Sequence, residues 1–357
     1  MPQVWQIAAG ETGRDYTKLF LDYDLMFMGP GNPGAYYKHS YDALVEQGLV
    51  KKGIATQLRQ FCTEINGNDI VLLRLGSQAK AIGWIRPWRA PGEYRWMSTF
   101  DDVFGWDLQH TRRVIWQHHL TDDLQKIQKS KGLFYYRGSA FSKVNRLEGQ
   151  ILELFKQCKP RDLKPLPSLP EPLTLEELGT ELFSKGLPNE DVDKFILAIQ
   201  RQRRLAKWYR AQSKKPAEHE VVAHMILPFM LALGWSEQLL AVEWNRIDLA
   251  AFSRTPRKKE NVCLLCEAKE YGHGLQNKTF SQATNYIKRL KLDNCKRILL
   301  TDGERLYLYQ RKKDDSWDEN PVGYLNVKLI RTNHIAPAGT SAVDTIMALT
   351  PAGINRV

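Results

Sequence analysis

Short apolar runs separated by turn residues dominate the first 150 positions of the chain. A glycine- and proline-rich turn occupies residues 29–34, and helical spacing follows over residues 55–65. Two β-rich apolar runs, residues 70–75 and 80–85, are separated by Gly76 and Ser77. Strands at this spacing, punctuated by glycine, predict a small closed or half-closed β-barrel within residues 1–155.

The pattern changes after residue 155. Five prolines lie between residues 159 and 172, and proline stiffens a chain toward polyproline II, so this stretch predicts a semi-rigid spacer. Thr174 is placed to cap a helix that continues to about residue 212, with a break near residues 186–188. We expect residues 156–215 to form a linker and helical connector.

The later part of this connector is strongly basic, and it includes Arg203, Arg204 and Lys207. Two interpretations remain open at this point: a solvated helix face, or a strip that follows the phosphates of a nucleic acid.

From residue 216 one helical segment precedes strands that alternate with a helix, which is typical of an α/β unit. We expect this domain to cover residues 216–335 and to be followed by a tail, residues 336–357. The predicted fold class is therefore multidomain, α/β and α+β, with an N-terminal barrel, a helical connector and a C-terminal α/β domain.

The composition excludes several classes of protein. With 43% hydrophobic and 25% charged residues, the chain is neither fibrous nor largely disordered. It has no run of about 18 apolar residues and no secretory signal pattern, so we expect no membrane span. Five cysteines are an odd and low number, which favours a reducing cytoplasm over a disulfide scaffold.

The charge balance points to a polyanionic partner. Fifty-one Lys and Arg residues against 40 Asp and Glu residues give a formal net charge of +11. Such a balance is compatible with nucleic acid through counterion release at phosphates, although net charge alone does not establish a partner.

The most specific chemical signal is a buried-strand run that ends at Glu267 and Lys269. Side chains alternate along a strand, so these two residues share a face, and Asp248 on the preceding strand can join them. Carboxylates hold Mg²⁺ for phosphodiester hydrolysis, and a neighbouring lysine orients or deprotonates the attacking water. The alternative is a purely structural role, in which Asp248 caps a turn and Glu267 and Lys269 form an exposed ion pair that contributes little to stability.

Six elements in this region resemble the PD-(D/E)XK nuclease superfamily, in particular the nuclease domain of type I restriction motor subunits. They are a helical Glu218 ten residues before Pro228, the turn 233–235, Asp248, Glu267-Ala268-Lys269, the pair Gln282 and Tyr286, and the run 299–303. The resemblance implies that Asp248 and Glu267 bind Mg²⁺, with Mn²⁺ as a substitute, and that Lys269 serves the water.

The same resemblance gives roles to the surrounding residues. Glu218 would assist from the first helix, although Glu220 lies on that helix too and only spacing favours Glu218. Gln282 and Tyr286 would contact the active site or the DNA backbone.

The segments 67–71 and 81–83 resemble the central hairpin of PUA-like barrels, a group that includes the EVE and YTH-type readers of modified bases. This resemblance implies a pocket for a base rotated out of a duplex, in which stacking supplies affinity. Trp5, Trp106 and Asp107 are the expected pocket residues, and Arg112 and Arg113 the expected phosphate contacts. Tryptophan is, however, more often a core residue than a ligand wall.

Together these features predict a modification-dependent, type IV-like restriction endonuclease that acts on double-stranded DNA carrying a modified base. One such centre cuts one strand, so we expect a homodimer. The chain has no Gly-x-x-x-x-Gly-Lys-Ser/Thr motif, and we expect no ATP-driven step. The alternative is a non-catalytic protein that binds modified DNA or RNA and uses the nuclease fold as a scaffold.

Overall fold

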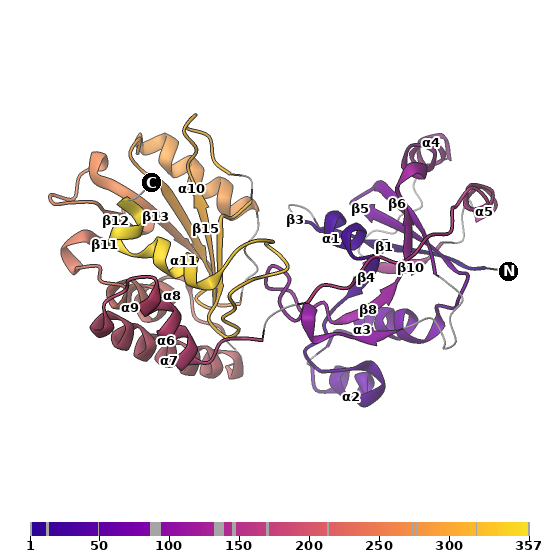
Figure 1. Cartoon of the computed structure of the whole chain (residues 1–357), viewed down its shortest axis with the longest axis horizontal. Helices are drawn as coiled ribbons and strands as arrows, with labels where there is room; N and C mark the ends of the chain where they lie inside the picture. The colour runs from indigo at the N-terminus through magenta and orange to yellow at the C-terminus, as the bar shows by residue number, and fades with distance from the viewer. Residues whose placement is uncertain are drawn as a thin grey trace. The chain divides into compact units, whose positions relative to one another are not determined.

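The computed structural model describes residues 2–11, 14–48, 50–85, 94–131, 139–144, 148–168, 171–212, 214–272, 275, 277–318 and 320–355. The chain divides into two compact units, Met1–Ser168 and Leu169–Val357 (Figure 1). Both combine helices with β-sheets, so the protein is a multidomain mixed α/β chain. Within the described ranges, no helix has the length and apolarity that a membrane crossing requires.

A five-stranded sheet forms the centre of the N-terminal unit, in the order β10-β1-β5-β6-β9. Strands β1 and β5 are parallel, and the other neighbours are antiparallel. The expected strands near residues 70–75 and 80–85 are confirmed as β5 and β6. The strands of this sheet are β1 (Val4–Ala8), β5 (Ile70–Leu75), β6 (Gln78–Trp84), β9 (Ile115–Gln117) and β10 (Phe141–Lys143).

A second sheet of this unit has the order β4-β8-β7, and its strand β8 is followed after one residue by β9 of the first sheet. Strand β8 pairs with β4, Val114 donates its N–H to Asp24 O at 2.9 Å, and the chain continues directly as β9 beside β6. Among the described residues, the two sheets are connected through β8 and β9 but do not close into a barrel. The strands of the second sheet are β4 (Leu25–Met28), β7 (Arg95–Trp96) and β8 (His110–Arg113). Strands β2 (Gly10–Glu11) and β3 (Arg14–Asp15) form a separate antiparallel pair.

Five α-helices surround these sheets within the described residues of this unit. The helical spacing of residues 55–65 is confirmed, because α3 continues into a π-helical turn, Gln60–Glu64. The helices are α1 (Thr17–Asp22), α2 (Tyr41–Glu46), α3 (Lys52–Arg59), α4 (Thr121–Lys131) and α5 (Glu148–Phe155).

The first part of the proline-rich stretch is fixed to the N-terminal unit and is not a free spacer. Both guanidinium NH2 groups of Arg161 donate to the fully buried carboxylate of Asp24 at 2.6 Å. The backbone N–H of Lys164 donates to the same carboxylate at 2.9 Å. A buried carboxylate needs such partners, so this segment is held where Asp24 lies.

The C-terminal unit is built on a six-stranded mixed sheet in the order β11-β12-β13-β14-β15-β16. Only the central pair, β13 and β14, is parallel. The strands are β11 (Leu240–Trp244), β12 (Ile247–Phe252), β13 (Val262–Ala268), β14 (Arg297–Thr301), β15 (Arg305–Gln310) and β16 (Gly323–Asn326).

The two helices expected in a connector belong to the core of this unit. Thr174 and Glu177 form a capping box at the start of α6, which confirms the expected helix start. Leu178 of α6 and Phe195 of α7 pack in one apolar cluster with sheet residues. The helices of the unit are α6 (Leu175–Ser184), α7 (Asn189–Ala211), α8 (Glu218–Val221), α9 (Leu227–Ala232), α10 (Asn277–Leu290), α11 (Ala342–Leu349) and α12 (Pro351–Asn355).

Residues 336–357 are likewise more than a tail. Ile346 of α11 and Ile354 of α12 are fully buried in the same apolar cluster. The apolar positions of these two short helices therefore complete the core that α6 and α7 begin.

The two faces of the six-stranded sheet are covered differently, and this positions the candidate site. Cys266 and Leu299 face the apolar cluster of α6, α7, α9 and α11. Their neighbours along the strands, Glu267 and Leu300, are register partners on the opposite face. Helix α10 covers that face, as Gln282 contacts Glu267 (Figure 1).

We predict that Gly83→Ala destabilises the N-terminal unit by about 1–3 kcal/mol, because a Cβ at Gly83 would lie 2.3 Å from Val114 Cγ1 and 2.5 Å from Trp116 Cε3. Urea unfolding followed by tryptophan fluorescence measures the change. Gly53→Ala is the matched control: a Cβ there meets open space, so no loss is expected. Equal stability of Gly83→Ala and the wild type would contradict the packing described here.

Candidate active site

Glu267 lies at the centre of the candidate site, at the end of the central strand β13. Its side chain is 2% exposed. Oε1 accepts hydrogen bonds from Lys269 Nζ at 2.9 Å and from Gln282 Nε2. Oε2 is buried and has no hydrogen-bond partner among the described residues. An unpartnered buried carboxylate oxygen is costly unless a ligand, a water or a proton satisfies it.

Asp248 brings a second carboxylate to Glu267 from the neighbouring strand. Leu249 pairs with Cys266, which sets Asp248 opposite Glu267 in the antiparallel ladder. Asp248 Oδ2 accepts the backbone N–H of Ala268 at 2.7 Å. The half-buried side chain is thereby held against the end of β13, and the two carboxylates predicted from the strand pattern come together.

Lys269 joins the carboxylates to the first helix of the site. Its ammonium group contacts Glu267 Oε1 at 2.9 Å and Glu218 Oε1 at 3.2 Å, and its side chain is only 14% exposed. The backbone N–H of Lys269 donates to Thr301 O at 2.8 Å, which extends the parallel ladder past the end of β13. Strand pairing therefore fixes the direction of this side chain.

The geometry separates the roles of the two glutamates on α8. Glu218 contacts Lys269, whereas Glu220 turns back and accepts the backbone N–H of Ala217 at 3.0 Å. Glu220 is thus used in capping the helix. The structure places Glu218, and not Glu220, in the cluster.

Burial and mutual repulsion shift the carboxyl groups toward their protonated forms. Burial, followed by the charge of Asp248, raises the pKa of Glu267 to about 7. Burial also raises the pKa of Asp248, against the hydrogen bond from Ala268. For Lys269, burial lowers the pKa, but the bonds to Glu267 and Glu218 outweigh it and raise the net value. A divalent cation would remove the repulsion between the two carboxylates.

The donor set fits Mg²⁺, which prefers carboxylate oxygens and keeps several waters. Asp248 and Glu267 supply two hard oxygen donors, one of them the unpartnered Oε2. The described residues contain no group of three His, Cys, Asp or Glu side chains arranged to hold a metal, so a closed structural site is not present there. An open site completed by water and a phosphate is the arrangement that these two carboxylates allow.

Helix α10 adds polar groups beside the carboxylates. Gln282 Nε2 reaches Glu267 and lies 3.4 Å from the hydroxyl of Tyr286, one turn further along. The Arg289 guanidinium lies 4.9 Å from the centre of the Tyr286 ring. These residues line a surface depression with Lys278, Ser281 and Asn285. The depression offers two cationic side chains, Lys278 and Arg289, and hydrogen-bond donors around Gln282, which contacts Glu267.

The expected nucleic-acid contacts on α7 divide into two kinds. Arg204 and Lys207 are exposed. Arg203 is half-buried, and its Nε donates to Val327 O at 2.7 Å. This hydrogen bond ties α7 to Val327, and the expected phosphate contact of Arg203 stays a prediction.

Two further expectations in the N-terminal unit are corrected by burial. Trp5 is 1% exposed, stacks on Phe141 at 5.1 Å and donates to Asp69 Oδ2 at 2.9 Å. Arg112 is also 1% exposed and donates to the carbonyls of Phe61 and Cys62. Trp5 is a core residue and Arg112 ties β8 to the turn after α3, so neither contacts DNA in this conformation.

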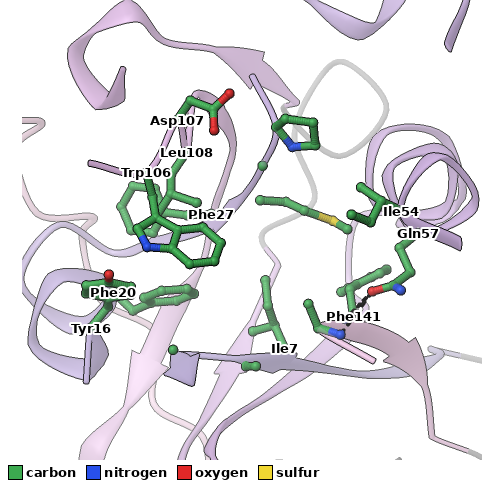
Figure 2. A pocket seen from close by; sticks show the side chains of 16 residues that line it. Ile7, Tyr16, Phe20, Phe27, Ile54, Gln57, Trp106, Asp107, Leu108 and Phe141 are labelled. Atoms are coloured by element: carbon green, nitrogen blue, oxygen red, sulfur yellow. Dashed lines mark hydrogen bonds between the residues drawn. The ribbon is translucent and has the colours of Figure 1, made fainter. Parts of the chain in front are cut away.

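The other three predicted residues of this unit lie nearer the surface. Trp106, which is 39% exposed, and Asp107 belong to the wall of a cavity of about 540 Å³ (Figure 2). Arg113 donates to Lys164 O. The sequence did not reveal Phe20, Phe27 and Gln57 as cavity residues, because they come from separate segments and carry no shared motif.

Comparison of the chain with models of protein families, with curated proteins and with solved structures found no match. A functional assignment therefore depends on the residues and the geometry given above.

We predict an altered pH dependence of stability for Glu267→Gln in metal-free buffer. The raised pKa, about 7 against a usual 4.5, means that the folded protein binds this proton more tightly than the unfolded chain. The resulting stability is present below pH 4.5 and is lost as the pH rises through 7. Glu267→Gln carries no such proton, so its thermal midpoint should fall less than that of the wild type between pH 5.5 and pH 8.

Glu270→Gln provides the matched control, because Glu270 is exposed and lies three positions from Glu267. It should keep the pH slope of the wild type. Identical slopes for the wild type and Glu267→Gln would show that the carboxyl group is not held as described.

Proposed function

We propose that the protein is a modification-dependent endonuclease that hydrolyses phosphodiester bonds in DNA carrying a modified base. The observation that supports this most directly is the convergence of Asp248, Glu267 and Lys269, with Glu267 Oε2 buried and unpartnered. A buried carboxylate oxygen without a partner, next to a second carboxylate, is the arrangement expected of a metal ligand. The resemblance to PD-(D/E)XK nucleases gives the same three residues the same roles.

Asp248 and Glu267 would hold the metal. Bound Mg²⁺, or Mn²⁺ in its place, would offset the charge that develops on the phosphate and lower the pKa of a coordinated water.

The remaining residues act on position and charge. Gln282 and Lys269 both donate to Glu267 Oε1 and so direct the other oxygen, Oε2, to the ligand position. Lys269 stays protonated through its bonds to Glu267 and Glu218, and its ammonium group can donate to a water or a phosphate oxygen at this position. Glu218 holds that ammonium group in place from α8.

The N-terminal unit would supply the choice of DNA. We propose that it is a PUA/EVE-like reader whose cavity, at Trp106 and Asp107, receives a base rotated out of the duplex. Arg113, Tyr286, Arg204 and Lys207 would contact the DNA backbone. The reaction would need no ATP, and a cytoplasmic location agrees with the five free cysteines.

A homodimer on DNA completes the proposal, because one such centre cuts one strand and a double-strand break needs two. Sedimentation of the protein with a cognate duplex would show two chains per duplex.

We predict that Lys269→Ala abolishes Mg²⁺-dependent nicking of modified DNA and leaves DNA binding within about twofold of the wild type. Removing one positioned cation of this kind costs about 10²–10³-fold in rate. Nicking of a supercoiled plasmid and a binding titration in EDTA measure the two effects. Lys194→Ala, an exposed lysine paired with Glu190 on α7, is the control and should cut normally.

Two results would contradict this proposal in different ways. Loss of both cutting and binding in Lys269→Ala would mean that the residue is structural. Absence of cleavage by the wild type on modified and unmodified DNA alike would favour a non-catalytic binding protein.

We predict a second effect on the electrostatics of binding. Arg204→Ala and Lys207→Ala should each reduce the slope of log K against log salt by about 1, because each removes one phosphate contact. Lys194→Ala should leave the slope unchanged. Unaltered slopes in both α7 variants would show that this helix face is only solvated.

A further inference from the structure

Helix α7 carries an exposed tryptophan near its C-terminal end. Trp208 is 56% exposed, although tryptophan is on average one of the more highly buried residue types. The centre of its ring lies 5.1 Å from that of the buried Tyr209. More than half of the residue's surface therefore remains available to a ligand.

The surface around Trp208 is cationic. Seven of residues 201–215 are Lys or Arg and none is Asp or Glu. Arg204 lies one helical turn before Trp208 and Lys207 directly precedes it, and both are exposed. Arg201, two turns before Trp208, is exposed as well and donates its Nη1 to His224 O at 2.6 Å. One face of the helix thus combines a large aromatic ring with several cations.

The N-terminal half of α7 has a different surface. Glu190, Asp193 and Lys194 are exposed there, and Lys194 is paired with Glu190 at 2.7 Å. Leu197, which is 64% exposed, lies between the two halves. Single exposed apolar residues are ordinary, so exposure alone does not mark a site. What distinguishes Trp208 is an aromatic ring within a cationic surface.

The cationic end of α7 adjoins the segment that follows the candidate active site. The ring of Tyr209 lies 5.6 Å from that of Tyr271, which is two positions after Lys269. The Tyr271 hydroxyl donates to Ala206 O of α7 at 3.0 Å. A DNA strand in a duplex advances about 3.4 Å per nucleotide. A few nucleotides therefore span the distance between Lys269 and Trp208.

These groups suit an unpaired nucleic-acid strand. Aromatic side chains stack on the faces of all four bases, and neighbouring cations bind the phosphates. In a duplex the base faces are covered by the adjacent pairs. A ring on the surface of a helix consequently reaches a base face only where the strand is unpaired or a base has left the stack.

We propose that Trp208 stacks on a base of an unpaired DNA segment beside the cleavage site, while Arg204 and Lys207 bind the phosphates of that segment. The inference rests on the proposed function, since it takes DNA as the polymer that the C-terminal unit binds. It adds a preference for locally unpaired DNA that does not depend on a modified base.

The test is binding of unmodified DNA by the full-length protein, measured by fluorescence anisotropy in EDTA. The probes are an oligo(dT) strand, a duplex, and the same duplex with a central bubble of unpaired thymines. We expect the wild type to bind the bubble at least about fivefold more tightly than the duplex, which is the smallest gain expected from one stacked base.

Trp208→Ala should lose this gain on the bubble and bind oligo(dT) at least about fivefold more weakly. Its affinity for the duplex should stay within about twofold of the wild type. The slope of log K against log salt should not change, because the substitution removes no charge.

Two further variants are the controls. Trp208→Phe keeps an aromatic ring at the same position and should retain most of the preference for the bubble. Leu197→Ala removes an exposed apolar side chain from the same helix and should bind all three probes like the wild type.

The contrary outcomes separate this inference from the proposed function. Equal binding of bubble and duplex by the wild type, or unchanged binding of the bubble by Trp208→Ala, would overturn the inference and leave the nuclease proposal intact. An equal loss on duplex and bubble would also overturn it, because stacking on an unpaired base affects only the bubble. Nicking of modified DNA with Mg²⁺ tests the nuclease role independently of these results.

A second copy of the chain is the other occupant that this face could take. Sedimentation of the DNA-free wild type and Trp208→Ala distinguishes the two cases. We expect the same oligomeric state for both proteins. A dimeric wild type and a monomeric Trp208→Ala would place a protein interface on this face and overturn the inference.

Discussion

The buried carboxylate of Glu267 is the constraint on which the C-terminal unit depends. Packing a charge at the end of a central strand is unfavourable unless it is paired. Lys269 and Gln282 satisfy one oxygen, and both are placed by structure around the strand: the β14 ladder for Lys269 and helix α10 for Gln282. The second oxygen, Oε2, has no hydrogen-bond partner among the described residues. The fold therefore carries a local cost that a bound cation would relieve, as is common where function and stability conflict.

The sequence predicts those site residues whose placement depends only on neighbouring positions in the chain. Asp248, Glu267 and Lys269 were predictable because side chains alternate along a strand, which fixes the face of the sheet on which each one lies. Trp5 and Arg112 were misassigned because composition gives a residue type and no burial. Trp5 stacks on Phe141, and Arg112 reaches carbonyls about 50 positions away. Only the tertiary fold brings such partners together.

The same limit applies to the architecture. Element positions were predictable from periodicity, as Thr174 and the strands β5 and β6 show. The assignment of elements to domains was not predictable. Helices α6 and α7 were expected to form a connector because basic residues dominate their sequence, yet Leu178 and Phe195 are fully buried in the C-terminal core. Conversely, the prolines suggested a spacer, while Arg161 binds the buried Asp24 across 137 positions. Local stiffness does not say what a segment packs against.

The stretch that joins β8 to β9 through Val114 has a consequence for the proposed reading of a base. One continuous stretch, from His110 to Gln117, is hydrogen-bonded into both sheets of the N-terminal unit, and Asp107 and Leu108 immediately precede it. A movement of one sheet against the other would break hydrogen bonds of this stretch, and these bonds therefore restrain the cavity walls that it carries. An incoming guest then loses little affinity to rearrangement of its host. Under the proposed reader function, discrimination between bases would depend on the shape and polarity of these restrained walls.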